Sequence, residues 1–342
     1  MRTRTSVFAL CLAAGLLATT LVSLCTGASS LTPRDAVSAL VAGPPSDTAE
    51  PADARNRSIV WQIRLPRLFL AFLVGAGLAA SGVVMQAFFQ NPMAAPYVVG
   101  VSAGAALGAT IGFVIWSGTS LLGLSGRTLF AFIGAIGVTT LVYMLSRRGG
   151  RVLTATLLLT GMAVSALASA LCSLLLMVAR TQDVSLVVFW LMGSVAGRGW
   201  LAVWVLVGPV LLGLIAVYIF SRELNVLLMG EETAHHLGVN VERTKLVLLF
   251  LSSILAAACV SMTGMIGFVG LMVPHLIRSI TGPDHRVLLP AAAVGGALLL
   301  ALADVVARTV VAPVEIPIGI VTSILGCPFF LYLLHRSRAA RL

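Results

Sequence analysis

The stretch LFLAFLVGAGLAASGVVMQAFFQNPMAAPYVVGVSAGAALGATIGFVIW, residues 68–116, decides the fold class of this chain. It contains no Asp, Glu, Lys or Arg, and these residues remain absent through residue 126. A membrane-spanning helix needs about 20 mainly apolar residues, so this stretch is too long for one span. Its interior QNPMAAPY (90–97) contains Pro92 and Pro96, which end helices. The stretch therefore predicts two spanning helices joined by a turn.

The composition of the whole chain agrees with that interpretation. The 342 residues are 59% hydrophobic and 10% charged, whereas soluble domains carry about 25% charged residues. The net charge of +10 could indicate nucleic-acid binding. However, no basic run is interleaved with aromatic residues, and the arginines lie in loops and at the ends of apolar segments, where they set membrane orientation. The sequence predicts an all-α integral membrane protein that does not bind nucleic acid.

Charge-free stretches and glycine or proline breaks divide the chain into about ten predicted spanning helices, in one transmembrane domain over 1–342. A further short apolar piece at 185–193 predicts a re-entrant or interfacial helix. The stretch 246–277 divides near TGMIG (263–267), and its second half predicts a short helix broken around Pro274. The predicted helices are 6–28, 65–87, 97–117, 128–146, 152–178, 200–221, 243–263, 268–280, 288–309 and 318–335.

Lysine and arginine counts predict the orientation. With both termini in the cytoplasm, most of the 22 Lys and Arg residues fall on the cytoplasmic side, as the positive-inside rule requires. The loop 29–64 then faces outside, and the segment 222–243 faces the cytoplasm. The apolar run Val7–Leu24 is longer than a signal-peptide core and predicts the first span. We expect a multi-pass protein of a bacterial-type cytoplasmic (inner) membrane.

No catalytic or metal-binding pattern is visible. The five cysteines form no CxxC pair, and His235 and His236 are adjacent, so they point about 100° apart on a helix and cannot readily share a metal. No serine–histidine–aspartate set, paired carboxylates or phosphate-binding GxxxxGK[ST] loop is present. We expect a transport protein that binds no cofactor or metal. If transport needs ATP, a partner chain must hydrolyse it.

Few polar groups lie within the predicted spans. Asp304 and Arg308 are four residues apart on one helix face, with the acid first, which favours a structural ion pair; a functional role for the pair stays open. Thr160 could line a pathway, although hydroxyls in helices often bond to their own backbone. The scarcity of mid-span carboxylates argues against a proton-coupled transporter.

The segment LNVLLMGEETAHHLGVNVERTK, residues 224–245, is charged within an otherwise apolar chain. Glycines at 230 and 238 bracket good helix formers, and acidic residues come early. This pattern is typical of one or two short helices lying across the cytoplasmic face. A charged, structured cytoplasmic loop is suited to docking a soluble partner, and an ordinary solvated loop is the alternative.

Eight stretches, in order, carry a resemblance to a known family: VWQIRLPRLFLAFLVGAGLAASGVVMQ (60–86), QNPMAAPYVVGVSAGAALGA (90–109), LLLTGMAVSA (157–166), FWLMGSVAG (189–197), LNVLLMGEETAHHLGV (224–239), GMIGFVGLMVPHLIRSITGPDHRVLLP (264–290), ADVVAR (303–308) and EIPIGIVTSILGCPFFLYLL (315–334). The chain resembles the permease subunit of type II ATP-binding-cassette importers, the FecCD-type family that takes up iron chelates, haem and cobalamin. The first 59 residues match only as a generic span and loop.

The resemblance implies ten helices per subunit, and two permeases, the second a copy of this chain or a homologue, around one pathway. It also implies two cytoplasmic ATPase subunits and an extracytoplasmic substrate-binding protein. Binding-protein docking is implied for Arg64 and Arg67 of the RLPR motif and for Arg308. Gate positions are implied for Asn91, Pro92, Met93 and Thr154, with Met93 where leucine is more usual. The implied ATPase-coupling residues are Met229, Gly230, Glu231, Glu232, His235, Leu237 and Gly238.

The sequence leaves alternatives open for the transported substrate and for the class of membrane protein. The quoted motifs occur in siderophore, haem and cobalamin permeases alike, and family frequencies favour an iron chelate, siderophore or haem, over cobalamin. A secondary transporter or channel without an ATPase is a different class, disfavoured by the few mid-span carboxylates. A membrane-embedded enzyme would need a catalytic set that the sequence does not show.

Overall fold

Helices account for nearly all of the structure, a computed structural model that describes residues 2–27, 29, 31–45, 51–116, 125–149 and 151–339. A two-residue antiparallel pair, β1 (Arg147–Arg148) and β2 (Arg151–Val152), is the one strand pairing in these residues. The helices are α1 (Arg2–Cys25), α2 (Pro33–Val41), α3 (Pro51–Ser58), the π-helical η1 (Ile59–Arg64), α4 (Leu65–Phe88), the 3-10 turn η2 (Pro96–Val99), α5 (Val101–Val114), α6 (Gly126–Ser146), α7 (Thr154–Val178), α8 (Thr181–Leu191), α9 (Trp200–Ile219), α10 (Ser221–Leu227), α11 (Glu231–His236), α12 (Val241–Thr263), α13 (Val269–Thr281), α14 (His285–Thr309) and α15 (Ile318–Ala339).

Within the described residues, seven helices are long and apolar enough to cross a membrane. They are the continuous helix Pro51–Phe88, which includes α4, and α6, α7, α9, α12, α14 and α15. Three shorter apolar helices, α1, α5 and α13, complete the ten segments predicted from the sequence. The predicted all-α membrane fold is confirmed. The predicted interfacial piece corresponds to α8, whose 11 residues are too short to span.

One local prediction was incomplete and one was wrong. The segment 29–64, predicted only as a connecting loop, contains α2, α3 and η1, and of these α3 and η1 run into α4 without a break. Proline at the first position favours both short helices, and the Thr32 side chain caps α2 by accepting from the Asp35 amide at 3.2 Å. Pro274 does not interrupt α13, which is helical on both sides of it. A proline costs one backbone hydrogen bond, and packed membrane helices tolerate that loss.

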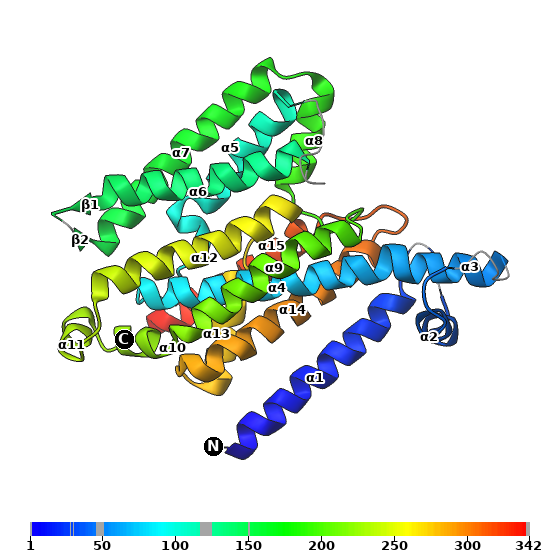
Figure 1. Cartoon of the computed structure of the whole chain (residues 1–342), viewed down its shortest axis with the longest axis horizontal. Coiled ribbons are helices and arrows are strands. Elements are labelled where there is room, and N and C mark those ends of the chain that lie inside the picture. Colours follow the sequence, from blue (N-terminus) through cyan, green and yellow to red (C-terminus); the bar gives the residue numbers. More distant parts are fainter. Residues whose placement is uncertain are drawn as a thin grey trace.

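The helix α4 is the centre of the bundle, and α9, α12, α13 and α14 surround it (Figure 1). Its glycines let backbones touch. A Cβ added to Gly75 would lie 2.1 Å from the Gly296 carbonyl oxygen, and one added to Gly82 would lie 1.8 Å from that of Gly270. Only glycine permits such approaches, and small residues are the usual means of close packing between helices in lipid. Three further helices, α5, α6 and α7, form a second layer (Figure 1).

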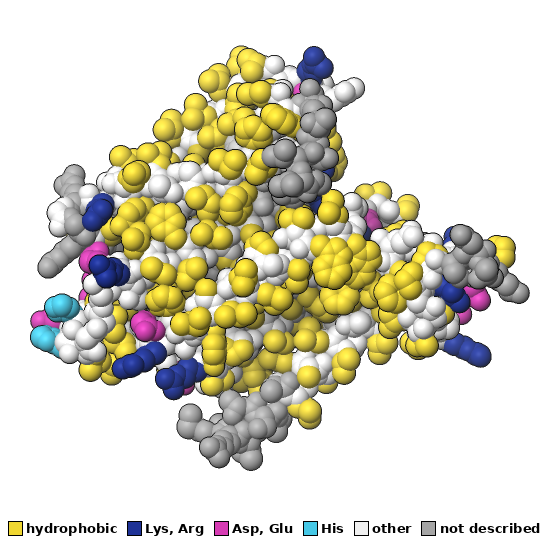
Figure 2. All heavy atoms as spheres, viewed as in Figure 1, with side chains coloured by type: hydrophobic (Ala, Val, Ile, Leu, Met, Phe, Trp, Pro, Cys, Tyr) yellow, Lys and Arg dark blue, Asp and Glu magenta, His cyan; other side chains and the backbone are white. Residues whose placement is uncertain are grey.

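The two ends of the bundle are polar. The start of α1, the end of α15, the β1–β2 hairpin and α11 lie at one end, whereas α2 and α3 lie at the other (Figure 1). Figure 2 shows that most of the charged side chains of this face gather at the two ends, with hydrophobic surface between them. Both ends of the chain therefore lie on the side of the charged segment. We call these ends the α11 end and the opposite end.

Candidate functional site

A buried ion cluster lies at the opposite end, where α4 meets α14. Arg67, 8% exposed, donates from Nε to both Asp304 carboxylate oxygens at 2.9 and 3.1 Å, and its Nη2 lies 2.8 Å from Oδ1. Its Nη1 donates to both Glu315 carboxylate oxygens at 2.9 Å. The planar guanidinium thus joins two carboxylates at once, a geometry that lysine could not reproduce. We call Arg64, Arg67, Asp304, Arg308 and Glu315 the ion cluster.

The predicted pair of Asp304 and Arg308 is present but secondary. Arg308 Nε lies 3.5 Å from Asp304 Oδ2, and this Nε is buried without a hydrogen-bond partner. The hydrogen bonds of Asp304 come from Arg67 instead, which the helical i, i+4 spacing could not reveal. Glu315, the second carboxylate, was missed because it follows α14 in a connecting segment with no pattern of its own.

Two arginines of the ion cluster bind the end of α1. Arg308 Nη2 donates to the Ser23 carbonyl and hydroxyl oxygens at 3.0 and 2.6 Å, and Nη1 donates to the Thr26 carbonyl oxygen at 3.2 Å. Arg64 donates to the carbonyl oxygens of Leu24 and Ser29. The last carbonyls of a helix lack intrahelical partners and attract cations. These arginines therefore fasten α1 to the bundle.

All three arginines implied in binding-protein docking are thus buried, with Arg64 3% and Arg308 5% exposed. Their donors point at partners within the chain. The most accessible charge of the cluster is the Glu315 side chain, at 43% exposure. In this conformation an acidic partner would have to compete with internal acceptors, and docking by these arginines stays a prediction.

The implied coupling residues form a short exposed segment at the α11 end. Gly230 and Gly238 have φ values of 102° and 80°, which favour glycine and set the turns on either side of α11. Met229 and Leu237 are 66% and 56% exposed. Solvent-exposed apolar side chains at a charged end of the protein are typical of a docking surface. Beside them lies a groove of about 620 Å³, lined by Glu231, Glu232, His235, Gly238, Val239, Asn240, Val241 and Glu242.

This segment is tied to the helices behind it. Glu231 forms an ion pair with Lys245 of α12, whose ammonium lies 5.7 Å from the centre of the Phe88 ring at the end of α4. Gln90 Nε2 donates to the Leu227 carbonyl oxygen at 2.8 Å. A displacement of α11 would therefore be passed to α12 and to the turn after α4.

A second tie joins α10 to the start of α14. Asn225 Nδ2 donates to Asp284 Oδ1 at 2.7 Å, and Asn225 Oδ1 accepts from the His285 backbone N at 2.8 Å. The His285 Nδ1 is 2.7 Å from the same oxygen and is therefore the protonated nitrogen. Hydrogen bonds from Asn225 and from the Arg286 amide hold the pKa of Asp284 below its ordinary value. No local sequence pattern indicates this link, because the partners are about 60 residues apart.

The implied gate residues lie on separate elements. The Met93 amide donates to the Asn91 side-chain oxygen at 2.9 Å, which closes the turn that also contains Pro92. Thr154 begins α7 and Thr160 lies further along it, both partly buried. No hydrogen bond between the turn and these threonines occurs in the described part of the chain.

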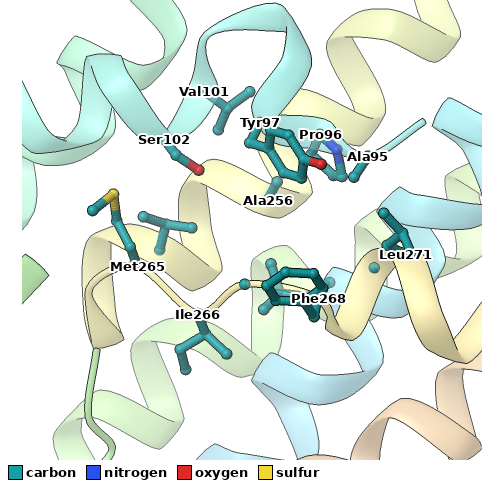
Figure 3. A pocket seen from close by; sticks show the side chains of 14 residues that line it. Ala95, Pro96, Tyr97, Val101, Ser102, Ala256, Met265, Ile266, Phe268 and Leu271 are labelled. Atoms are coloured by element: carbon teal, nitrogen blue, oxygen red, sulfur yellow. The ribbon is translucent and has the colours of Figure 1, made fainter. Parts of the chain in front are cut away.

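A partly open cavity of about 270 Å³ lies beside η2 (Figure 3), between α4, α5, α12, α13 and the connection from α12 to α13. Tyr97, Ser102, Met265 and Phe268 are among its lining residues. Its walls are mainly apolar, and it contains no carboxylate or basic side chain. It offers room for an apolar group or for helix movement, and the sequence did not predict it.

Comparisons with known proteins place the chain among transport permeases. The FecCD transport family matches residues 15–336. The hemin transport system permease HmuU of Yersinia pestis is 46% identical over 82% of this chain and 85% of that protein. The cobalamin import system permease BtuC of Halobacterium salinarum is 47% identical over 83% of this chain and 74% of that protein.

Solved structures agree. A metal-chelate type ABC transporter in an inward-facing conformation has a TM-score of 0.81 and 35% identity, over 96% of this chain and 98% of that chain. PsaBC from Streptococcus pneumoniae has a TM-score of 0.56 at 18% identity, over 78% of this chain and 88% of that chain, and shows similarity of fold.

Proposed function

Because the chain belongs to the FecCD transport family, we propose that two copies of it form the pathway of an ATP-driven importer in a bacterial-type cytoplasmic membrane. Two ATPase subunits dock at the α11 end, and a substrate-binding protein docks at the opposite end. The chain itself holds no ATP and no cofactor. The observation that carries the proposal is the exposed α11 segment. Its apolar and acidic side chains face outward, its ion pair reaches α12, and the preceding α10 is hydrogen-bonded to the start of α14.

The contacts behind α11 supply a route for coupling. An ATPase that moves α11 acts on α12 through Glu231 and Lys245. It acts on α14 through the neighbouring α10, whose Asn225 is bonded to Asp284. Rigid elements with ion pairs between them are the usual carriers of such coupling. The turn at Asn91–Met93 is reached through Gln90, which gives the proposed gate a direct mechanical connection to the coupling segment.

The proposed substrate is an iron chelate, haem or a ferric siderophore. The similarity to a hemin permease supports it. Cobalamin is a second candidate, since a cobalamin permease is about equally similar.

The substrate is tested by reconstitution. The chain, co-expressed with its ATPase and binding protein in cells lacking such systems, is expected to take up labelled haem or ferric siderophore when ATP is available. Labelled cobalamin in a parallel assay is the comparison. Uptake of cobalamin alone would overturn the iron-chelate assignment, and uptake without any ATPase would overturn the ATP-driven mechanism.

Docking at the opposite end is tested through Glu315. This carboxylate occupies Arg67 Nη1 and is the acceptor with which an acidic partner would compete. Glu315→Gln removes one negative charge and leaves that donor with a neutral acceptor, so binding-protein affinity is expected to rise, most at low salt where screening is weakest. An unchanged or weaker affinity would contradict docking through Arg67. Asp53→Asn, which removes the same charge from exposed α3, is the control.

A further inference from the structure

Two arginines at the opposite end lack an acidic partner. Arg127 is the second residue of α6, and Arg198 precedes α9; both line a cavity of about 210 Å³ with Ser125 and Thr128. In the described ranges neither guanidinium forms an ion pair or a hydrogen bond, and Arg127 Nε is buried without a partner. Its guanidinium carbon lies 5.5 Å from the centre of the Phe113 ring, which holds the group in place. Two cations therefore face one cavity with no anion between them.

The electrostatics of this cavity favour an anion. Burial lowers the pKa of Arg198, and the nearby charge of Arg127 lowers it further. The hydroxyls of Ser125 and Thr128 are 3.0 Å apart and share one hydrogen bond, which leaves one O–H free to donate at the start of α6. Helix N-termini attract anions, and paired arginines bind phosphate oxygens in a bidentate manner. Phosphate or a similar oxyanion would supply acceptors for the two guanidiniums.

The apolar part of the cavity wall favours an amphipathic anion over a small soluble one. Its remaining wall is apolar: Leu201, Ala202, Val205 and Met262. The apolar surface continues along α9, where Leu201, Trp204, Leu211, Leu212 and Ile215 are at least half exposed. Trp200 stacks on Trp204 with ring centres 6.2 Å apart, and tryptophans mark the level of lipid headgroups.

We propose that this cavity binds an anionic phospholipid of the leaflet at the opposite end. The phosphate lies between Arg127 and Arg198, and one acyl chain follows the exposed face of α9. A headgroup with net negative charge is favoured over a zwitterionic one, because the two guanidiniums repel the ammonium group of a zwitterionic headgroup. The site is separate from the ion cluster and from α11, so it does not depend on the proposed transport function.

The test is lipid retention by the purified protein, measured by native mass spectrometry after exchange into detergent containing phosphatidylglycerol or phosphatidylcholine. The wild type is expected to keep phosphatidylglycerol. Arg127→Gln with Arg198→Gln is expected to weaken that retention at least about tenfold. Arg180→Gln is the matched control, since this exposed arginine precedes α8 at the same end outside the cavity. Arg127→Lys with Arg198→Lys, which keeps both charges, is expected to restore part of the retention.

Three outcomes would overturn the proposal. The first is equal retention of phosphatidylglycerol by the wild type and the double glutamine variant, with both intact by size exclusion. The second is equal retention of phosphatidylcholine and phosphatidylglycerol by the wild type. The third is displacement of the lipid by millimolar inorganic phosphate, which would assign the cavity to a soluble anion. If the glutamine variant does not fold, the lysine variant and the phosphate competition still decide the matter.

Discussion

Neutralising Asp304 should destabilise this protein far more than neutralising Glu315, although both carboxylates bind the same arginine. The Asp304 side chain is 2% exposed and lies against Arg67 and Arg308, whereas the Glu315 side chain is 43% exposed. Asp304→Asn leaves the buried Arg308 without a counter-charge and leaves Arg67 with only the half-exposed Glu315, and breaking a buried pair in this way costs about 3–5 kcal/mol. Glu315→Gln removes one side of a half-exposed pair, worth about 0–1 kcal/mol.

The assay is thermal unfolding of the purified proteins in one detergent, followed by intrinsic tryptophan fluorescence. At about 2 °C per kcal/mol for a chain of this size, Asp304→Asn is expected to unfold about 5–10 °C below the wild type, and Glu315→Gln within about 2 °C of it. The two variants differ from each other only in where the charge is removed. Equal unfolding temperatures for the two would refute the idea that burial decides the strength of the cluster.

Three further predictions concern other parts of the structure. Gly82→Ala is expected to lower the unfolding temperature by several degrees, because the added Cβ would overlap the α13 backbone. Gly208→Ala is the control and should be neutral or stabilising, because no atom lies within 4 Å of its added Cβ. Equal effects of the two substitutions would contradict the close packing of α4 against α13. Glu231→Arg with Glu232→Arg is expected to leave ATP hydrolysis running without transport in reconstituted vesicles, and wild-type uptake would remove the coupling assignment. The folded-state pKa of Asp284 is lowered, so its contribution to stability is present above about pH 4 and is lost as the pH falls through the lowered pKa. The difference in unfolding temperature between the wild type and Asp284→Asn should therefore shrink over that range, and a constant difference would contradict this role of Asp284.

The sequence was sufficient to predict the architecture, because each membrane span is determined by its own local run of apolar residues. The charge-free residues 68–126 and the break at 263–267 predict helices that the structure contains, since each span satisfies its own backbone. The same locality explains where the sequence is insufficient. Pro274 predicts a break in α13, but packed membrane helices tolerate a proline. The polar residues of 29–64 predict a connecting loop, and the Thr32 cap and the prolines at 33 and 51 favour the short helices within it.

The sequence predicted which residues belong to the candidate sites, but it did not predict which of these residues contact one another. The coupling residues are contiguous, so a pattern within 224–245 could find them. The partner of Asp304 could not be found this way, because Arg67 is 237 positions away and the contact exists only once α4 and α14 have packed. The same is true of the link from Asn225 to Asp284. Long-range polar contacts depend on which helices become neighbours, and hydropathy says nothing about that choice.

The helix α14 has a polar attachment near each end and touches α4 backbone to backbone between them. Its Asn225 contact at His285 and its Arg67 contact at Asp304 are about 28 Å apart along the axis, at 1.5 Å per residue. Such a rod acts as a lever: a tilt of about 10° around the glycine contact would displace one end relative to the other by about 5 Å. A hydrogen bond is broken by a displacement far smaller than that. The two ends of the bundle are thus joined by one inextensible element, so a displacement at the α11 end and a displacement of Asp304 and Arg308 at the opposite end would be a single event.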